Sequence, residues 1–173
     1  MTTEDDRPRV SVELDRAEAL RLLGSVPLGR VVFTRHALPT VRPVNHVLDG
    51  CDIVIRTHEG AELTSYARRA DGAGVVVAYE ADAIDPDTHL GWSVVVTGYA
   101  RLVTDPDELA RYRRLPHPWV ARTMDHVVRI RPDLVTGIRL TTNGGPPSPS
   151  APEASGSSAP DAGDGAQGAR SRP

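Results

Sequence analysis

Residues 74–103 read GVVVAYEADAIDPDTHLGWSVVVTGYARLV, and this stretch decides the fold. Its two valine-rich halves, 74–84 and 90–103, are typical of long β-strands. The polar segment 85–89 between them contains a proline and two aspartates, which favour a turn over a continued strand. The stretch therefore predicts two long strands joined by a short loop.

The residues before this stretch predict more strands and one helix. β-rich runs occupy 29–35, 40–48 and 52–57, and Asp49-Gly50 between the last two is a hairpin turn signal. We predict that the three runs form a meander. The segment 61–69 consists of good helix formers with apolar residues on one face, so it predicts a short helix.

Capping signals place two further helices. Asp15 followed by Glu18 resembles a capping box for a helix that ends at Gly24. Asp105, Pro106 and Glu108 predict the start of another helix, which runs through Arg114. Strands are expected at 126–131 and 134–140, with Pro132-Asp133 as the turn between them.

These elements predict one domain, 10–141, that is mainly β (α+β): a small β-barrel with short helices packed outside. The remaining segment, 142–173, is rich in glycine, proline, alanine and serine and has no aromatic residue. Such a composition buries too little apolar surface to offset chain entropy, so we expect a disordered tail.

Composition limits the classes of function. The formal net charge of −3 gives no overall attraction to nucleic acid, and no apolar run is long enough to span a membrane. All 20 basic residues are arginine, which excludes chemistry that needs a lysine side chain. The single Cys51 and an N-terminus without a signal-peptide pattern predict a cytoplasmic protein.

Common catalytic and cofactor motifs are absent. The sequence has no GxSxG nucleophile elbow, because Gly91-Trp92-Ser93 is followed by valines. It has neither HExxH nor a Cys/His cluster with zinc spacing, so we expect no metal site. It also lacks GxGxxG, so any phosphate group must be held in another way. We assign no catalytic side chain.

Arginines on strands are the candidates for holding a phosphate. Arg42 and Arg56 lie on neighbouring predicted strands, and Thr57 adds a hydroxyl beside Arg56. A guanidinium group forms paired, charge-assisted hydrogen bonds with phosphate oxygens. The alternative is that both arginines are solvated surface residues. Trp92 is likewise either a core or interface residue or the wall of a pocket for a flat ligand.

The order of these segments resembles the pyridoxamine 5'-phosphate oxidase-like, FMN-binding split-barrel superfamily. The resemblance covers roughly 12–140, and its most specific parts are PVNHVLDG, IVIRTHEG and GWSVVVTG. Within that superfamily, the chain is similar to the small actinobacterial-type flavin and deazaflavin proteins. The resemblance implies a six-stranded antiparallel split barrel that forms a homodimer, with FMN in a groove between the subunits.

The resemblance also implies roles for individual residues. Arg42 falls where an arginine contacts the phosphate, and Arg56 and Thr57 fall near the ribityl phosphate. Val44 and Asn45 fall on the strand that borders the flavin ring. The strand that approaches the flavin from the partner subunit carries Trp92 and Ser93.

One residue departs from the family pattern. Relatives commonly place a lysine or a small polar residue after the EG turn, whereas this chain has Glu62, whose charge would repel a phosphate. Arg68 or Arg69 could compensate. If they do not, FMN binds weakly or the cofactor differs, for example a deazaflavin.

The expected function is that of a flavin-dependent oxidoreductase acting on an unidentified small molecule, with the chemistry supplied by the cofactor. Three alternatives stay open: a deazaflavin-dependent reductase, a non-catalytic flavin carrier or sensor, and a haem-handling split barrel. The haem alternative requires His46 or His58 as an axial ligand. His46 could otherwise contact a substrate or simply pack in the structure.

Overall fold

A computed structural model of the chain describes residues 8–58, 61–68, 74–114 and 124–142. The described residues form eight strands and three short helices. The strands are β1 (Arg9–Glu13), β2 (Leu28–Arg35), β3 (Leu38–Asn45), β4 (Val47–Asp49), β5 (Asp52–Thr57), β6 (Val75–Ile84), β7 (Gly91–Leu102) and β8 (His126–Thr142). The helices are α1 (Arg16–Leu23), α2 (Glu62–Arg68) and α3 (Pro106–Arg113).

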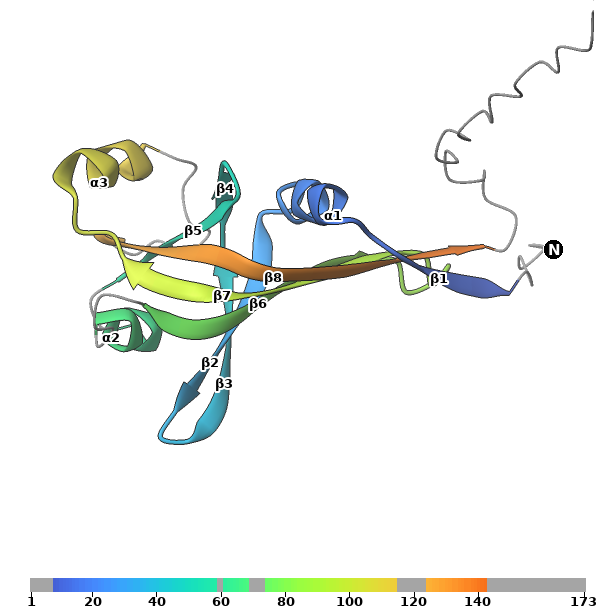
Figure 1. Cartoon of the computed structure of the whole chain (residues 1–173), viewed down its shortest axis with the longest axis horizontal. Coiled ribbons are helices and arrows are strands. Elements are labelled where there is room, and N and C mark those ends of the chain that lie inside the picture. The colour runs from blue at the N-terminus through green and yellow to red at the C-terminus, as the bar shows by residue number, and fades with distance from the viewer. Residues whose placement is uncertain (1–7, 59–60, 69–73, 115–123, 143–173) are drawn as a thin grey trace, which may run out of the picture.

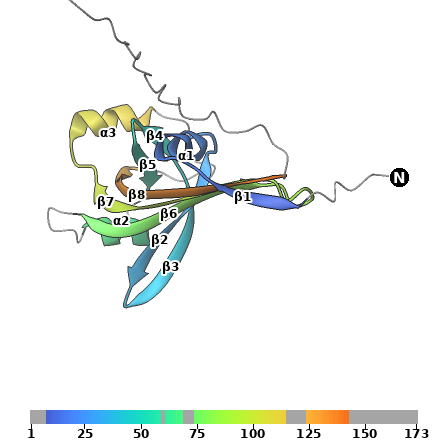
Figure 2. The same cartoon turned by 45° about the vertical axis from the view of Figure 1, so that its right-hand side comes forward.

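The strands form one antiparallel sheet that curls on itself. The order along it is β3-β2-β6-β7-β8-β5-β4, so β3 and β4 are its two ends. Yet these two strands are separated in the chain by His46 alone. The two ends of the sheet must therefore lie close together, which requires the strongly curled, incompletely closed sheet of a split barrel. Figures 1 and 2 show the β2–β3 hairpin turned away from the long strands β6, β7 and β8.

The mainly β, antiparallel fold confirms the predicted class, but this path has seven strands rather than six. The predicted run 40–48 divides into β3 and β4 at His46, because the chain changes partner there. The His46 N–H still donates to the Pro27 carbonyl, 3.0 Å away and in register with the Leu28–Asn45 pair, whereas Val47 pairs with Val54 of β5. The predicted three-strand meander is therefore wrong. β2 pairs with β3 and β4 pairs with β5, but the two hairpins lie at opposite ends of the path.

The predicted turn at Pro132-Asp133 is also wrong, because β8 runs unbroken from His126 to Thr142. Its first part pairs with β5 and its last part with β1, a strand that the sequence did not predict. Proline lacks the N–H that a regular ladder needs. The sheet accommodates Pro132 opposite Gly98, where the register between β7 and β8 shifts. Proline here marks a bulge rather than a turn.

The predicted helix caps are confirmed. The Asp15 side chain accepts a hydrogen bond from the Glu18 N–H at 2.8 Å and caps α1. The Asp105 side chain accepts from the N–H groups of Asp107 and Glu108 and caps α3. These bonds satisfy donors that the first turn of a helix leaves without partners, and this fixes where each helix begins.

The main core lies inside the curled sheet. Buried side chains of the inner sheet face, such as Val31, Ile55 and Val96, form one cluster with residues of α1 and α2. A smaller cluster joins α3 to the opposite face at β5 and the start of β8, through Tyr112, Val54 and Val127. We call the face that points into the main core the inner face and the other the outer face. Among the described helices, none is long and apolar enough to cross a membrane.

The outer face carries an exposed apolar patch beyond the part that α3 covers. Directly paired residues share a face, and so do residues two apart, so the register places seven exposed apolar side chains on this face. Two of them lie at strand ends, Leu28 at the start of β2 and Ile84 at the end of β6, and the other five are considered together. These residues, called the outer patch below, are Val41 (49% exposed), Val76 (57%), Val95 (39%), Leu134 (59%) and Ile138 (39%). Exposed apolar side chains that gather on one face are a common feature of association surfaces.

Candidate functional site

Strand alternation divides the seven residues predicted to bind the cofactor between the two faces of the sheet. Pairing and burial place four of them on the inner side and three on the outer side. The inner set is Arg42, Val44, Thr57 and Trp92, and the outer set is Asn45, Arg56 and Ser93. One protomer therefore does not bring all seven together.

Arg42 belongs to a compact charged cluster at the start of α2. It pairs with Val31 across the β2–β3 hairpin, on the side that α2 covers. The two oxygens of the Glu62 carboxylate accept from different arginines: Oε1 from Arg35 Nη1 and Oε2 from Arg42 Nη2. The Arg42 Nη1 also donates to the Val41 carbonyl at 2.9 Å. Glu62 thus neutralises the arginine that we expected to contact a phosphate.

Thr57 lies beneath the same helix. Its hydroxyl oxygen accepts from the Thr64 hydroxyl at 3.2 Å, and Thr64 is also 2.9 Å from the His58 carbonyl. Nearby, the rings of Phe33 and Tyr66 stack with centroids 5.2 Å apart. These contacts fix α2 against the end of β5 and the β2–β3 hairpin. Arg68 is exposed in the last turn of α2, and Arg69 lies outside the described residues.

Arg56 points away from this cluster. It pairs with Val127 on the side of β5 that faces α3. Its guanidinium donates to the carbonyls of Arg113, at 3.5 Å, and Met124, at 3.2 Å. Arg56 Nε is buried and has no acceptor among the described residues. Arg42 and Arg56 consequently do not form one phosphate site within a protomer.

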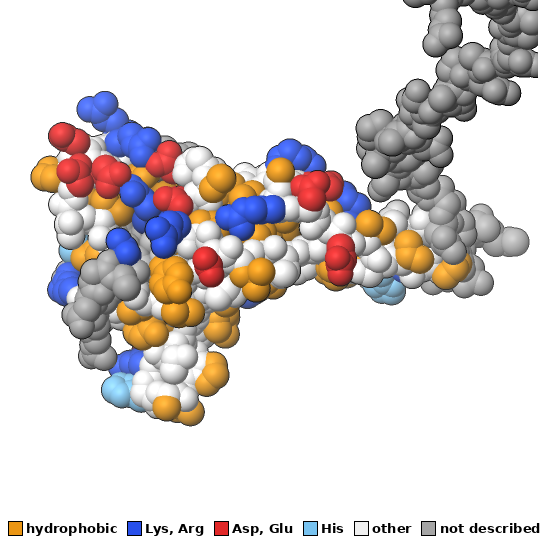
Figure 3. Space-filling model, in the orientation of Figure 1, with side chains coloured by type: hydrophobic (Ala, Val, Ile, Leu, Met, Phe, Trp, Pro, Cys, Tyr) orange, Lys and Arg blue, Asp and Glu red, His pale blue; other side chains and the backbone are white. Residues whose placement is uncertain are grey.

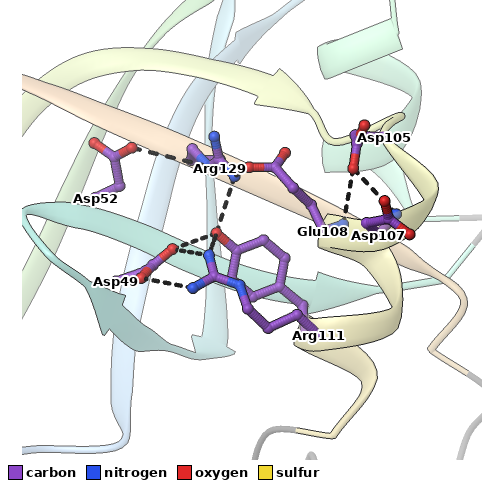
Figure 4. A network of polar contacts seen from close by, with 8 residues as sticks. Asp49, Asp52, Asp105, Asp107, Glu108, Arg111 and Arg129 are labelled. Carbon is purple, nitrogen blue, oxygen red and sulfur yellow. Dashed lines mark hydrogen bonds and ion pairs between the residues drawn. The ribbon is translucent and has the colours of Figure 1, made fainter.

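Beside α3, a network of charged side chains attaches this helix to the sheet. Figure 3 shows acidic and basic side chains gathered over this region, and Figure 4 shows Asp49, Arg111 and Arg129 meeting there. The Tyr112 hydroxyl donates to Asp49 Oδ2 at 2.5 Å and accepts from Arg111 and Arg129, each at 2.9 Å. The hydrogen bonds from Tyr112 and Arg111 lower the pKa of Asp49.

We expect Tyr112→Phe to lower the free energy of unfolding by about 1–2 kcal/mol, because Asp49, Arg111 and Arg129 each lose a hydrogen-bond partner. Urea denaturation followed by circular dichroism measures this change. Tyr99→Phe is the matched control, because the Tyr99 hydroxyl makes no hydrogen bond to any residue that the structure describes. Equal stabilities of the two variants would show that the network adds nothing to the fold.

Trp92 and Ser93 have different surroundings although they are neighbours on β7. The Trp92 side chain is buried in the main core. Ser93 pairs with Asp82 and Ile138 on the outer face, next to the outer patch. Asn45 is also on the outer face, and its amide donates to the Pro27 carbonyl at 3.2 Å. Asn45 and Ser93 therefore lie on the same face as the outer patch.

His46 closes the gap between β3 and β4 through a buried hydrogen-bonded pair. His46 Nε2 lies 2.9 Å from the Leu23 carbonyl, and Nδ1 lies 2.7 Å from the Tyr79 hydroxyl. The carbonyl can only accept, so Nε2 carries the proton and Nδ1 accepts from Tyr79. Both ring nitrogens are therefore engaged in hydrogen bonds, and His46 is buried. This arrangement argues against a contact of His46 with a substrate and against His46 as a haem ligand.

We expect the stability of the fold to fall at mildly acidic pH because of His46. Burial lowers the pKa of His46 below its ordinary value of 6.5, so the unfolded chain binds this proton at higher pH than the folded chain. The free energy of unfolding should fall as the pH drops from about 6.5 toward the folded-state pKa, by at most about 1.4 kcal/mol per pH unit, and His46 should have no effect above this window. Urea denaturation between about pH 5 and 7.5 measures the slope. If the His46→Ala variant shows the same dependence of unfolding free energy on pH, that dependence comes from other groups.

Comparison with known proteins agrees with this architecture. The family model described as pyridoxamine 5'-phosphate oxidase matches residues 15–139. The chain belongs to the pyridoxamine 5'-phosphate oxidase family. The match begins at the cap of α1 and ends near the end of β8, so it includes the seven strands from β2 to β8 and the three described helices but not β1.

The chain is also similar to individual proteins and solved structures. The uncharacterized protein Rv0080 of Mycobacterium tuberculosis is 55% identical over 139 residues, which are 80% of this chain and 91% of that protein. A FAD binding protein from Mycobacterium smegmatis is 36% identical, with a TM-score of 0.59, over 74% of this chain and 98% of that one. A structure from Corynebacterium glutamicum, provisionally named pyridoxamine 5'-phosphate oxidase, is 34% identical, with a TM-score of 0.63. The match covers 77% of this chain and 95% of that chain.

The site contains two residues that the sequence analysis did not select. Arg35 lies two positions after Phe33 on β2, so strand alternation alone placed it on the same face as Arg42 across the hairpin. Tyr79, the partner of His46, gave no such signal, because the two residues are 33 positions apart and lie in different strands. Among the described residues, no group of three or more His, Cys, Asp or Glu side chains is placed to hold a metal ion.

The Arg42 cluster does not fit the phosphate of FMN as it stands. A phosphate monoester carries nearly two negative charges at neutral pH. It would meet Glu62, which already accepts from both Arg35 and Arg42, while Arg56 faces α3. A flavin whose phosphate is bound at Arg42 would have to displace Glu62.

Proposed function

We propose that this protein binds a flavin between two copies of the chain and acts as an oxidoreductase on an unidentified small molecule. The observation that carries the proposal is the 36% identity to the Mycobacterium smegmatis FAD binding protein, which extends over 98% of that chain. Family membership across residues 15–139 supports it. A bound flavin supplies hydride or electron transfer, and the protein supplies binding, orientation and electrostatics.

The outer patch supports a homodimer. Its five exposed apolar residues come from four strands on one face of the sheet, and such a face can pair with its own copy about a twofold axis. Asn45 and Ser93 lie on that same outer face, so residues predicted to border the flavin would lie next to the second subunit. Arg42 lies on the inner side and would contribute only if the ligand displaced Glu62, whereas Thr57 is buried beneath α2.

Cofactor identity and assembly can be tested in one experiment. The full-length protein is incubated separately with FAD, FMN, riboflavin or a deazaflavin, passed through gel filtration and analysed by absorbance and light scattering. We expect a dimer that retains about one flavin per subunit. A folded protein that retains none of the four, with the cofactors in excess, would contradict the proposal.

A second step separates an enzyme from a flavin carrier or sensor. The loaded protein is mixed anaerobically with NADH or NADPH, and bleaching of the flavin absorbance near 450 nm or of the deazaflavin band measures reduction. Transfer onward to an added acceptor supports an oxidoreductase. Retention of the flavin without reduction or turnover by any donor supports the carrier instead.

A further inference from the structure

The arrangement of Arg35, Glu62 and Arg42 has the form of an occupied anion site. We propose that Arg35 and Arg42 form a binding site for a phosphate group, and that Glu62 fills this site as an internal ligand and so excludes phosphate from it. Glu62 is then the residue that determines the specificity of this part of the surface.

The two guanidinium groups are held toward one point by the hairpin itself. Arg42 pairs with Val31 and Arg35 pairs with Leu38, and the two arginines lie on the same side of β2 and β3. Each donates to a different oxygen of the same carboxylate. Arginines hold a phosphate in the same way, with their guanidinium groups donating hydrogen bonds to separate oxygens of one anion. The geometry is therefore that of oxyanion recognition, with Glu62 as the anion.

Charge and exposure decide what an external anion would meet. The two arginines and Glu62 leave a formal charge of only +1, whereas the arginines without the carboxylate would present +2. Both arginine side chains are 51% exposed and Glu62 is 28% exposed, so solvent anions can reach the guanidinium groups. A phosphate near neutral pH would be repelled by the carboxylate that stands between them.

Glu62 is not needed to hold α2 in place. Leu63 and Ala67 are buried in the main core, and Thr64 is fully buried and bonded to Thr57. The stacked rings of Phe33 and Tyr66 add a further contact. Exposed ion pairs contribute little to stability, so neutralising Glu62 should leave α2 docked and the two arginines available.

The test is a titration of inorganic phosphate into the full-length protein by isothermal calorimetry, at about pH 7.5 and low ionic strength, where electrostatic binding is least screened. We expect Glu62→Gln to bind phosphate at least about tenfold more tightly than the unaltered protein, as removal of one close like charge predicts. The gain should disappear in Glu62→Gln/Arg42→Gln. Glu13→Gln, which removes an exposed acid of β1, is the control for net charge and should show no gain.

Three results would overturn the proposal. The first is phosphate binding by the unaltered protein as tight as that of Glu62→Gln. The second is a gain that persists after Arg42→Gln is added, which would locate the phosphate elsewhere. The third is the absence of any gain in both Glu62→Gln and Glu62→Ala, two variants that keep a helix-forming residue at the start of α2.

A flavin titration extends the inference, and this part rests on the proposed function. FMN carries a terminal phosphate and riboflavin does not, so Glu62→Gln should raise the affinity for FMN by about the same factor as for phosphate and leave riboflavin unchanged. An equal gain for both flavins would contradict a phosphate site. If neither protein binds any flavin, the proposed function fails, while the calorimetric result with phosphate still decides the anion site.

Discussion

Gly91→Ala should lose at least about 4 kcal/mol of the free energy of unfolding, which is a large part of the stability of an ordinary domain. Gly91 begins β7 with φ of +146°, a conformation that residues with a side chain rarely adopt. A Cβ atom there would lie 2.0 Å from the Ala83 carbonyl oxygen and 2.8 Å from the Ile84 Cα. Both contacts are with backbone of the paired strand, so no side chain can move to relieve them.

Gly50→Ala separates the effect of backbone conformation from that of space. Gly50 also has a positive φ, +61°, but a Cβ atom there would have nothing within 4 Å. We expect this variant to lose only about 1–2 kcal/mol, the cost of a left-handed conformation for a residue with a side chain. Urea denaturation followed by circular dichroism compares the two variants. Equal losses would mean that β6 and β7 can separate at Gly91 without cost.

Local signals predicted most of the elements of this fold. Asp15 and Asp105 were correctly identified as helix caps, because a cap depends on residues within one turn. The turn at Gly50 was predicted for the same reason, since its positive φ favours glycine. Where the structure depends on neighbours along the chain, the sequence was sufficient.

Predictions that depended on distant residues were wrong. Pro132 was expected to end a strand, but a partner strand with Gly98 opposite it allows β8 to continue through a bulge. His46 was included in a continuous strand, although its backbone bonds to Pro27 and its ring bonds to Leu23 and Tyr79. Strand propensity alone reveals neither set of partners, because each depends on which strands pair and in which register, and Tyr79 lies in a strand 33 residues away from His46.

The candidate site was predicted in part for the same reason. The conflict between Glu62 and a phosphate at Arg42 was predicted from the charge of Glu62 together with the position that the family resemblance gives to the phosphate. The pairing of Glu62 with both Arg35 and Arg42 required the hairpin register and the position of α2. That pairing changes the interpretation of Glu62 from a residue that weakens a phosphate site to one that fills it.

The buried pair of His46 and Tyr79 carries the second large effect. We expect His46→Ala to lose about 3–5 kcal/mol of the free energy of unfolding, since it removes a buried ring and leaves two buried groups without partners. These are the Tyr79 hydroxyl, on a residue with no exposed surface, and the Leu23 carbonyl. His36→Ala, at an exposed position in the β2–β3 turn, is the matched control and should lose less than about 0.5 kcal/mol.

A double-mutant cycle with Tyr79→Phe shows how much of the loss belongs to the hydrogen bond between the two residues. Tyr79→Phe alone leaves His46 Nδ1 without a donor, whereas in His46→Ala/Tyr79→Phe no hydroxyl remains to be satisfied. The double variant should therefore be more stable than the sum of the single losses predicts, by about 1–2 kcal/mol. Strict additivity would mean that water replaces each missing partner. In that case the gap between β3 and β4 is open to solvent, and His46 serves only to fill space.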